Sequence, residues 1–488
     1  MKGTVLKGIR VAVAACVFTL VTLFFLGLVA GCGLLERLQL VPAFLACSVL
    51  PIVFWLFVTL LFGRIYCSMA CPFGILQDIL IRLFATTWGR RWKFRPPQRW
   101  AQALPWAFCM VLLVVGGTSL AGLLDPYSTY GRMASQLFAP LADLVNNVLA
   151  DALGTDGSVV LFKREVFIRS WAGFSLALSS FLLLILVAVW KGRLICNTIC
   201  PVGALLAAVS RKTVFGLAID ATACVACGRC STVCKALCLD GKSKSVDNAR
   251  CVRCFNCLNV CPKGALSFRK MASEKHVAPA ERREFMKSAL SGTLLVAASA
   301  NLARPKLRFV GAKSGMALPP PGATVDSLRL KCTACGLCVA RCPRQVLVPA
   351  GVSDYGPLGL LMPKMSFAHG FCDPSCTVCG EACPSGAIRP VVGTKKIGLA
   401  TFDRATCLAC TEKISCGLCE RRCPQKAISL QEESVKDGEK TVKIQVPVVD
   451  SSKCTGCGAC ENYCPSHAMR EGTIPTCKPQ QLDARSNE

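Results

Sequence analysis

Four long runs of apolar residues without a charged position mark the first part of the chain. They are Val11–Ala30, Leu40–Phe62, Ala103–Leu124 and Trp171–Trp190. Each holds about 20 residues, which as a helix with a rise of about 1.5 Å per residue matches the roughly 30 Å hydrocarbon core of a bilayer. A buried core helix of a soluble protein is seldom so long and so uniformly apolar. The pattern therefore predicts four membrane-spanning helices.

Basic residues around these runs give the expected orientation. Three of them precede the first run: Lys2, Lys7 and Arg10. The connection between the second and third runs carries seven, against the single acid Asp78: Arg64, Arg82, Arg90, Arg91, Lys93, Arg95 and Arg99. The connection between the third and fourth runs is nearly balanced in charge. Because positive loops stay in the cytoplasm, the N-terminus and the end of the fourth run are expected there.

A fifth apolar stretch, Ser288–Ala303, is too short for an ordinary span and suggests a short anchor. The residues before it, Glu281–Lys287, read Glu-Arg-Arg-Glu-Phe-Met-Lys and resemble a twin-arginine export signal. A short amphipathic surface helix is the alternative. With export, the chain from about Arg304 onward would be periplasmic.

Six groups of cysteines follow the fourth run and repeat a Cys-x2-Cys-x2-Cys-x3-Cys spacing with small variations. Pro follows the last cysteine in all groups but the first. The groups are Cys224, Cys227, Cys230 and Cys234; Cys251, Cys254, Cys257 and Cys261; Cys332, Cys335, Cys338 and Cys342; Cys372, Cys376, Cys379 and Cys383; Cys407 or Cys410 with Cys416, Cys419 and Cys423; and Cys454, Cys457, Cys460 and Cys464. This spacing binds [4Fe–4S] clusters in bacterial ferredoxins, where the cysteine before Pro ligates the other cluster of a pair. Zinc ribbons use two separated Cys-x2-Cys knuckles instead. The sequence therefore predicts six [4Fe–4S] clusters.

Crossed ligation is expected within the first pair of groups. Cys261 would complete the site of the first group, and Cys234 would complete the site of the second. The partners among the other four groups stay open, as does the choice between Cys407 and Cys410. Six further cysteines have no spaced partner and are interpreted as small hydrophobic residues or free thiols: Cys16, Cys32, Cys47, Cys109, Cys238 and Cys477.

A different repeat lies at the ends of the second and fourth apolar runs. Residues 63–74, GRIYCSMACPFG, match residues 192–203, GRLICNTICPVG. The two copies provide four thiols, Cys67, Cys71, Cys196 and Cys200, which is the number that one [4Fe–4S] cluster needs. The pattern favours a seventh, shared cluster over four structural cysteines at tight turns. Arg64 and Arg193 either offset the charge of that cluster or are membrane-boundary anchors.

Composition narrows the possible functions. The chain has 488 residues, of which 53% are hydrophobic, with 35 Cys, 3 His and a formal net charge of +27. Seven clusters at about −2 each would lower this charge to about +13, which removes the argument for nucleic acid. No Cys-x-x-Cys-His occurs, and no His precedes His276, so c-type haem and bis-His haem in the membrane are excluded. No set of catalytic residues is recognisable.

The first 270 residues or so resemble membrane polyferredoxins of the NapH type, through the paired Gly-Arg-x-x-Cys-x3-Cys-Pro-x-Gly motifs, the following pair of ferredoxin groups and the Asp125–Ser128 stretch. Residues from about Ala280 onward resemble exported four-cluster ferredoxins of the NapG and methylamine-utilisation type. In that pattern one isolated cysteine precedes the fifth group, which favours Cys407 as the ligand. The chain thus resembles a fusion of two modules that otherwise act as partners.

The resemblance implies an α-helical membrane fold with α+β bacterial-ferredoxin-like domains on both sides. The expected domains are a four-span membrane domain (1–215), a cytoplasmic two-cluster ferredoxin (216–272), a linker with the export-like segment and short anchor (273–325), and a periplasmic four-cluster polyferredoxin (326–488). It implies a multi-pass protein of the bacterial inner membrane, in contact with lipid and working within a larger complex.

In that family, such proteins act as quinol dehydrogenase components without a substrate-reducing site of their own. The expected function is to oxidise quinol from the quinone pool and relay electrons to a periplasmic oxidoreductase or cytochrome. Two alternatives remain open. One is a conduit that takes electrons outward from a cytoplasmic ferredoxin, and the other is a reductive assembly factor for metallocentres.

Overall fold

The computed structural model describes residues 3–29, 33–85, 92–96, 99–153, 163–271, 317–391, 393, 396–437 and 440–468. It divides into two compact units. One lies within Met1–Phe309 together with Arg329–Cys335, and the other within Val310–Leu328 together with Gly336–Glu488. The division does not fall at the expected boundary near residue 325 but inside the third cysteine group, since Arg329–Cys335 belongs to the first unit. The export-like segment and the short apolar stretch lie outside the described residues.

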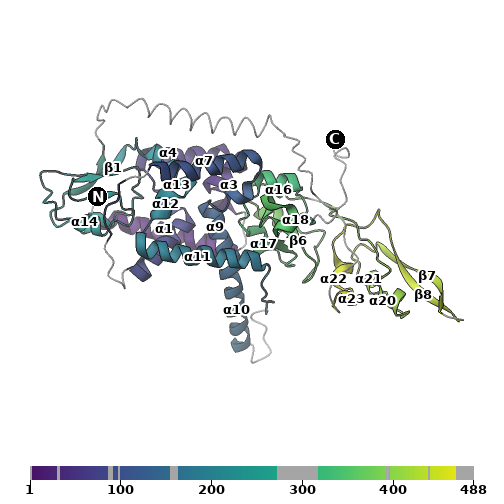
Figure 1. Ribbon diagram of the computed structural model, residues 1–488. Coiled ribbons are helices and arrows are strands. Elements are labelled where there is room, and N and C mark those ends of the chain that lie inside the picture. Colours follow the sequence, from purple (N-terminus) through teal and green to yellow (C-terminus); the bar gives the residue numbers. More distant parts are fainter. Residues whose placement is uncertain are drawn as a thin grey trace. The chain divides into compact units, whose positions relative to one another are not determined.

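Helices make up most of the first unit (Figure 1). Up to residue 153 they are α1 (Gly3–Phe25), α2 (Leu34–Arg37), α3 (Leu40–Leu45), α4 (Val49–Phe62), α5 (Tyr66–Met69), α6 (Pro72–Leu80), the π-helix η1 (Ile81–Ala85), α7 (Arg99–Val115), α8 (Thr118–Ala121), α9 (Pro126–Met133), the π-helix η2 (Ala134–Phe138) and α10 (Ala139–Leu153). From residue 171 they are α11 (Trp171–Lys191), α12 (Leu194–Thr198) and α13 (Pro201–Ser210).

The prediction of four spans is not supported, because among the described residues only α1 and α11 are single helices long and apolar enough to cross a membrane. The run Leu40–Phe62 is broken by a turn in which Cys47 has a φ of 55°, so α4 keeps only 14 residues. The run Ala103–Leu124 is broken at Gly116, whose φ is 79°, and the following α8 is a single short turn. Periodicity and composition do not reveal such breaks, since apolar residues continue on both sides of each turn.

A small ferredoxin lobe follows α13 and lies at one end of the helices (Figure 1). Strand β1 (Phe215–Ile219) pairs antiparallel with β4 (Leu266–Lys270), with Leu217 opposite Phe268. Between them come α14 (Arg229–Thr232), the hairpin of β2 (Leu239–Asp240) and β3 (Ser245–Val246), and the 3₁₀ turn η3 (Asn256–Asn259). The Phe62 and Phe215 rings stack at 5.7 Å, so the lobe packs directly on the end of α4.

After the gap that ends at residue 316 the elements are short. They are α16 (Val325–Lys331), α17 (Leu337–Arg341), β5 (Leu347–Pro349), α18 (Val352–Tyr355), η4 (Pro357–Gly359), β6 (Pro363–Met365), α19 (Val378–Ala382), α20 (Leu408–Thr411), α21 (Leu418–Arg421), β7 (Ile428–Asp437), β8 (Lys440–Val449), α22 (Ala459–Asn462) and α23 (Pro465–Ala468). The strands form two antiparallel pairs, β5 with β6 and β7 with β8. Two-stranded sheets and single helical turns match the α+β ferredoxin-like elements expected here.

Candidate metal centres

The two copies of the repeated motif fold in the same way. In each, the first cysteine lies in a short helix, Cys67 in α5 and Cys196 in α12. The second cysteine, Cys71 or Cys200, is the N-cap of the next helix, which begins at the following Pro. Pro suits this first helical position because its fixed φ is already helical and it needs no amide hydrogen. Each pair therefore spans two successive helices instead of one face of a single helix.

Two arginines cross between the copies and hold them together. Arg64 of the first copy donates to the carbonyl of Cys196 at 2.8 Å, and Arg193 of the second donates to the carbonyl of Cys67 at 2.8 Å. Neither arginine is exposed to solvent. The glycines of the motif make room for this arrangement. A Cβ on Gly74 would lie 2.3 Å from the Cys67 oxygen, and one on Gly203 would lie 2.2 Å from the Cys196 oxygen.

The two arginines differ in how their charge is balanced. Arg193 donates to the Asp78 carboxylate at 2.6 Å, and Asp78 also pairs with Lys235 at 2.7 Å and with Arg10. These cations lower the pKa of Asp78 against the effect of burial. Arg64 instead donates to the neutral amide of Asn197 at 2.6 Å and to Cys67 Sγ at 3.7 Å. Its charge therefore faces the cysteines.

All four thiols of the repeat are buried, at 4–8% exposure, and close enough for their charges to interact. Burial, and after it the neighbouring sulfurs, raise the pKa of Cys71 and Cys200 well above the ordinary value. Burial by itself would lower the pKa of Arg64, but Cys67, Cys196 and Cys200 raise it. Four buried thiols, of which Cys71, Cys196 and Cys200 resist ionising alone, lie beside a buried cation whose described partners include no carboxylate, and this fits a bound metal cluster that holds them as thiolates.

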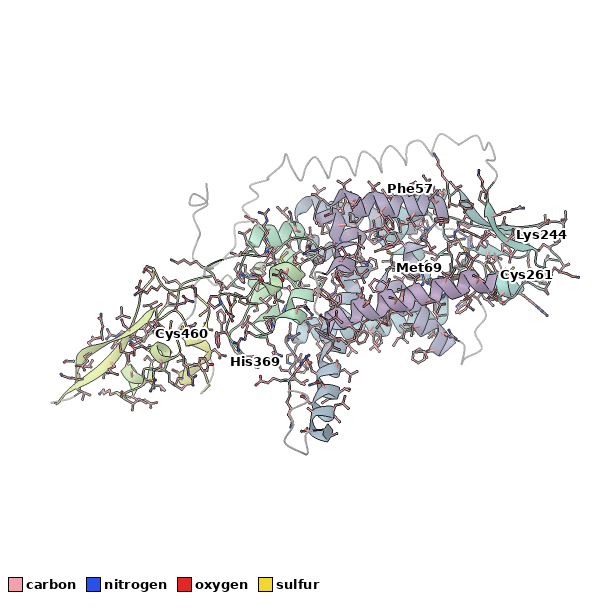
Figure 2. The ribbon with its side chains drawn as sticks, turned by 180° about the vertical axis from the view of Figure 1, so that it is seen from behind. Phe57, Met69, Lys244, Cys261, His369 and Cys460 are labelled. Atoms are coloured by element: carbon pink, nitrogen blue, oxygen red, sulfur yellow. The ribbon has the colours of Figure 1, made fainter. Side chains whose placement is uncertain are left out.

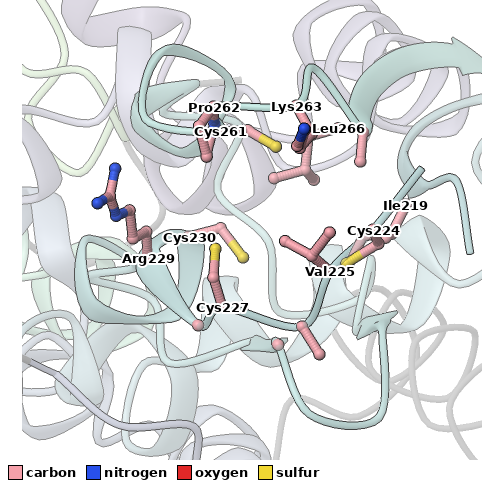
Figure 3. Close-up of a pocket in the computed structure, with 14 residues that line it drawn as sticks. Ile219, Cys224, Val225, Cys227, Arg229, Cys230, Cys261, Pro262, Lys263 and Leu266 are labelled. Atoms are coloured by element: carbon pink, nitrogen blue, oxygen red, sulfur yellow. The ribbon is translucent and has the colours of Figure 1, made fainter.

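In the ferredoxin lobe one pocket is lined by Cys224, Cys227, Cys230 and Cys261, together with Pro262. Figure 3 shows the four sulfurs directed toward the same space from both ends of the lobe sequence. These are the four cysteines for which crossed ligation was predicted. Within the first unit, Lys244 and Cys261 lie at one end, away from Met69, which lies among the helices (Figure 2).

A second pocket of the lobe is lined by Cys251, Cys254 and Cys257 with Cys234, again the predicted set. Cys238 lines it as well, and its sulfur lies 3.6 Å from that of Cys234. Cys238 has no partner in the predicted ferredoxin spacing. Its spacing of four from Cys234 was the available signal, because such a spacing often returns to the same face of a turn.

In the third to sixth cysteine groups, some cysteines of one group also lie beside those of another. One pocket is lined by Cys454, Cys457 and Cys460 with Cys423, so the last cysteine of the fifth group lies with the sixth group. Cys342 packs with Cys372 and Cys379 around Leu318 and Val346. Each of the remaining members is half-buried: Cys332, Cys335, Cys338, Cys376, Cys383, Cys407, Cys416, Cys419 and Cys464.

Cys407 and Cys410 are the two candidates for the remaining ligand of the fifth group, and they have different neighbours. Burial raises the pKa of Cys419 to about 11, and the charges of Cys416 and Cys407 contribute to the rise. Cys410 shares side-chain hydrogen bonds with both Arg404 and Cys407. Cys407 is the one of the two whose charge contributes to the raised pKa of Cys419.

The loops of four groups repeat one backbone feature. The residue before the second cysteine is left-handed in each: Ala226, Arg253, Ala334 and Gly456, with φ of 53°, 54°, 53° and 69°. This conformation turns successive sulfurs toward one centre and is costly for residues other than glycine, so its recurrence indicates a shared requirement. Within the described ranges, no three His, Cys, Asp or Glu side chains are placed to hold a single metal ion.

Comparison with protein families agrees with these sites. A model described as a 4Fe-4S binding domain matches residues 45–91 and 174–218, which contain the two copies of the repeat. Models described as 4Fe-4S dicluster domains match residues 247–346 and 414–468. The chain contains 4Fe–4S ferredoxin-type domains.

The curated relatives of this chain include proteins named as ferredoxin-type proteins. The chain is 36% identical over 157 residues to the methylamine utilization ferredoxin-type protein MauM of Methylophilus methylotrophus, covering 30% of this chain and 65% of the relative. It is 32% identical over 155 residues to the ferredoxin-type protein NapG of Escherichia coli, covering 29% and 64%. The chain thus spans slightly less than two thirds of these relatives. No solved structure matches it.

Proposed function

We propose that this protein is a membrane-anchored iron–sulfur electron carrier that oxidises quinol and passes electrons to a periplasmic redox partner. A [4Fe–4S] cluster supplies one-electron transfer, and the cysteine sets described above would hold six such clusters. Cys67, Cys71, Cys196 and Cys200 would hold a seventh. The chain's own contribution is to space these sites, anchor them and set their electrostatic surroundings.

The main support for this proposal is the position of α1 between two sets of predicted cluster ligands. At its start a Cβ on Gly3 would touch Leu258 in the ferredoxin lobe, and at its end Phe25 packs against Gly131, which abuts the Cys335 carbonyl. The 23 residues of α1 correspond to about 34 Å, close to the roughly 30 Å of a hydrocarbon core. Predicted cluster ligands thus lie near both ends of one membrane-length helix.

Lipid contact is supported by the surfaces of α1 and α11. Only 28% of the most apolar part of each helix is buried, although both are strongly hydrophobic. Large apolar side chains such as Leu20, Leu182 and Leu183 are exposed on them. A soluble protein seldom exposes so much contiguous apolar surface. Lys7 and Arg10 near the start of α1 and Lys191 at the end of α11 favour a cytoplasmic location for the lobe.

A polar pair beside the four-cysteine site supports the quinol assignment. The Tyr66 hydroxyl donates to Gln39 Oε1 at 2.7 Å, and Gln39 donates to the Ala70 carbonyl at 3.2 Å. The Trp55 ring packs edge-on to Tyr66 at 4.9 Å. These buried groups lie directly next to Cys67 and Cys71, and a quinol head group bound there would replace the Tyr66–Gln39 hydrogen bond, give its two electrons one at a time to the cluster sites and release its two protons to solvent.

The test uses the purified full-length protein in lipid nanodiscs under anaerobic conditions. A short-chain quinol is added, and reduction is followed by loss of visible cluster absorbance. We expect reduction in wild type and in Cys224→Ala, but not in Cys67→Ala, after iron content has been measured in each. Absence of reduction in wild type with all clusters present would overturn the quinol assignment.

One observation favours a second source of electrons. Cys227 is exposed at the first lobe pocket, so a cytoplasmic ferredoxin could reach that site directly. The same variants separate the two functions. A conduit from ferredoxin would lose its reduction by reduced ferredoxin in Cys224→Ala, whereas quinol-driven reduction would be kept.

A further inference from the structure

The first unit binds the start of the third cysteine group through contacts to its backbone. Thr118, at the start of α8, has its hydroxyl 2.8 Å from the carbonyl oxygens of both Arg329 and Cys332. Thr118 and Thr333 are both buried, at 2% and 3% exposure. The segment Arg329–Cys335 is thus held through its backbone, as a fixed part of the first unit.

Two glycines allow the backbone of this segment to come unusually close. A Cβ on Gly122 would lie 2.0 Å from the Thr333 carbonyl oxygen, and a Cβ on Gly131 would lie 2.4 Å from that of Cys335. Real Cβ atoms do not approach oxygen so closely, so a side chain at either position must displace the segment. The surface formed by Thr118, Gly122, Gly131 and Arg132, here called the seat, is therefore shaped for this occupant.

Arg132 connects the seat to the interior. It is 4% exposed and donates to the carbonyls of Ala334 at 3.4 Å and Gly122 at 3.0 Å. Burial lowers its pKa to about 10, while the charges of Asp125 and Cys335 oppose that effect. Asp125 in turn lies close enough to Cys71 for its charge to act on that thiol. The buried residues Cys71, Asp125 and Arg132 thus lead from the four-cysteine site to the half-buried Cys335.

We propose that the seat makes the site of Cys332 and Cys335 the entry point to the exported clusters. It would be the exported site that exchanges electrons directly with the site of Cys67, Cys71, Cys196 and Cys200. In this step one electron leaves the reduced membrane-edge site and joins the oxidised Cys332 site, with no bond made or broken and no proton moved. The inference deepens the proposed function by fixing which exported site comes first.

The experiment measures magnetic interaction between clusters, which depends on their distance and not on the source of electrons. The full-length protein in detergent is reduced completely with dithionite, and electron paramagnetic resonance records the relaxation of the membrane-edge signal, identified by its loss in Cys67→Ala. All comparisons are made in a Cys254→Ala background, which removes the neighbouring site of the lobe. Iron and acid-labile sulfide are measured in every sample.

We expect Cys332→Ala to abolish the remaining relaxation enhancement and the matched variant Cys454→Ala, which lies at another exported site, to leave it intact. Gly131→Ala should keep all its iron but weaken the enhancement, because the segment is pushed away. Gly8→Ala is its control, since a Cβ there has no neighbour within 4 Å. Thr118→Val gives a milder displacement if Gly131→Ala does not fold.

Enhancement that survives Cys332→Ala, or that is lost in Cys454→Ala, would overturn the assignment. Because dithionite supplies the electrons, this result is independent of whether quinol is the donor. A protein that shows the coupling but is not reduced by quinol would refute the proposed function and leave the seat in place.

Discussion

Replacing Arg64 tests whether the buried four-cysteine site holds a redox cluster. Arg64 is fully buried, donates to Cys67 Sγ at 3.7 Å, and has no carboxylate among the partners described for it. Reduction adds a negative charge to a [4Fe–4S] cluster, and a nearby fixed cation stabilises that reduced state. Arg64→Gln removes the cation while keeping a side chain that can donate hydrogen bonds, so the reduction potential should fall.

The magnitude follows from the distance. Two unit charges at about 4 Å interact by about 4 kcal/mol at an effective dielectric constant of about 20. The added electron is spread over the whole cluster, so we take roughly half, about 2 kcal/mol, which corresponds to about 90 mV for one electron. A decrease of 50 to 150 mV, on the order of this estimate, is the expected result.

The assay is a redox titration followed by electron paramagnetic resonance. The signal of the four-cysteine site is assigned by its absence in Cys67→Ala. Arg64→Lys is the matched control, because it keeps the charge but loses the planar set of donors that reaches both Asn197 and Cys196. It should keep most of the wild-type potential.

A potential in Arg64→Gln within about 20 mV of wild type, with all iron present, would refute the electrostatic reasoning, since it corresponds to less than about 0.5 kcal/mol. Loss of the cluster in Arg64→Gln but not in Arg64→Lys would instead show that the charge is needed for binding.

Four further outcomes are expected. Cys67→Ala should lose about four irons per chain, and Cys109→Ala, which changes another buried thiol, should lose none. Cys407→Ala should lose about four irons while Cys410→Ala retains them. Asp78→Asn leaves buried cations around a neutral amide, so the free energy of unfolding should fall by about 3–5 kcal/mol, measured by denaturation in detergent. Because the folded pKa of Asp78 is lowered, its stabilisation is complete above about pH 4, the ordinary pKa of Asp, and should be lost as the pH falls below it.

The cysteine sites were largely predictable from sequence because their chemistry fixes their spacing. Two intervening residues and a left-handed residue such as Ala226 aim sulfurs at one centre, and the pattern survives whatever surrounds it. The grouping of Cys261 with the first lobe group and Cys234 with the second followed from the same rule. Cys238 was not predicted to join them, because a fifth sulfur lies outside that spacing, and its four-residue separation from Cys234 was the weak sequence signal of the contact.

The helices were less predictable, because an apolar run does not reveal where its backbone turns. The breaks at Cys47 and Gly116 are single residues with positive φ inside continuous hydrophobic sequence. The seat for Arg329–Cys335 was also invisible, since it depends on backbone carbonyls meeting Gly122 and Gly131 from a distant part of the chain. Glycine in an apolar run is ordinary in membrane helices, so neither position stood out.

The two copies of the repeat differ at one acidic position, and this difference gives Arg193 and Arg64 different roles. Position 78 is Asp in the first copy, and the matching position in the second is Ala207, so only Arg193 obtains a carboxylate. Three buried cations surround Asp78: Arg10 from α1, Arg193 two residues after the end of α11, and Lys235 from the lobe. Residues that the charge pattern assigns to a cytoplasmic surface therefore join both long helices to the lobe. Because the second copy has Ala207 instead of an aspartate, Arg64 has no matching carboxylate and its positive charge faces the four thiols. The difference between Asp78 and Ala207 therefore has two effects. Asp78 joins the long helices to the lobe, and Ala207 leaves the charge of Arg64 available to a cluster.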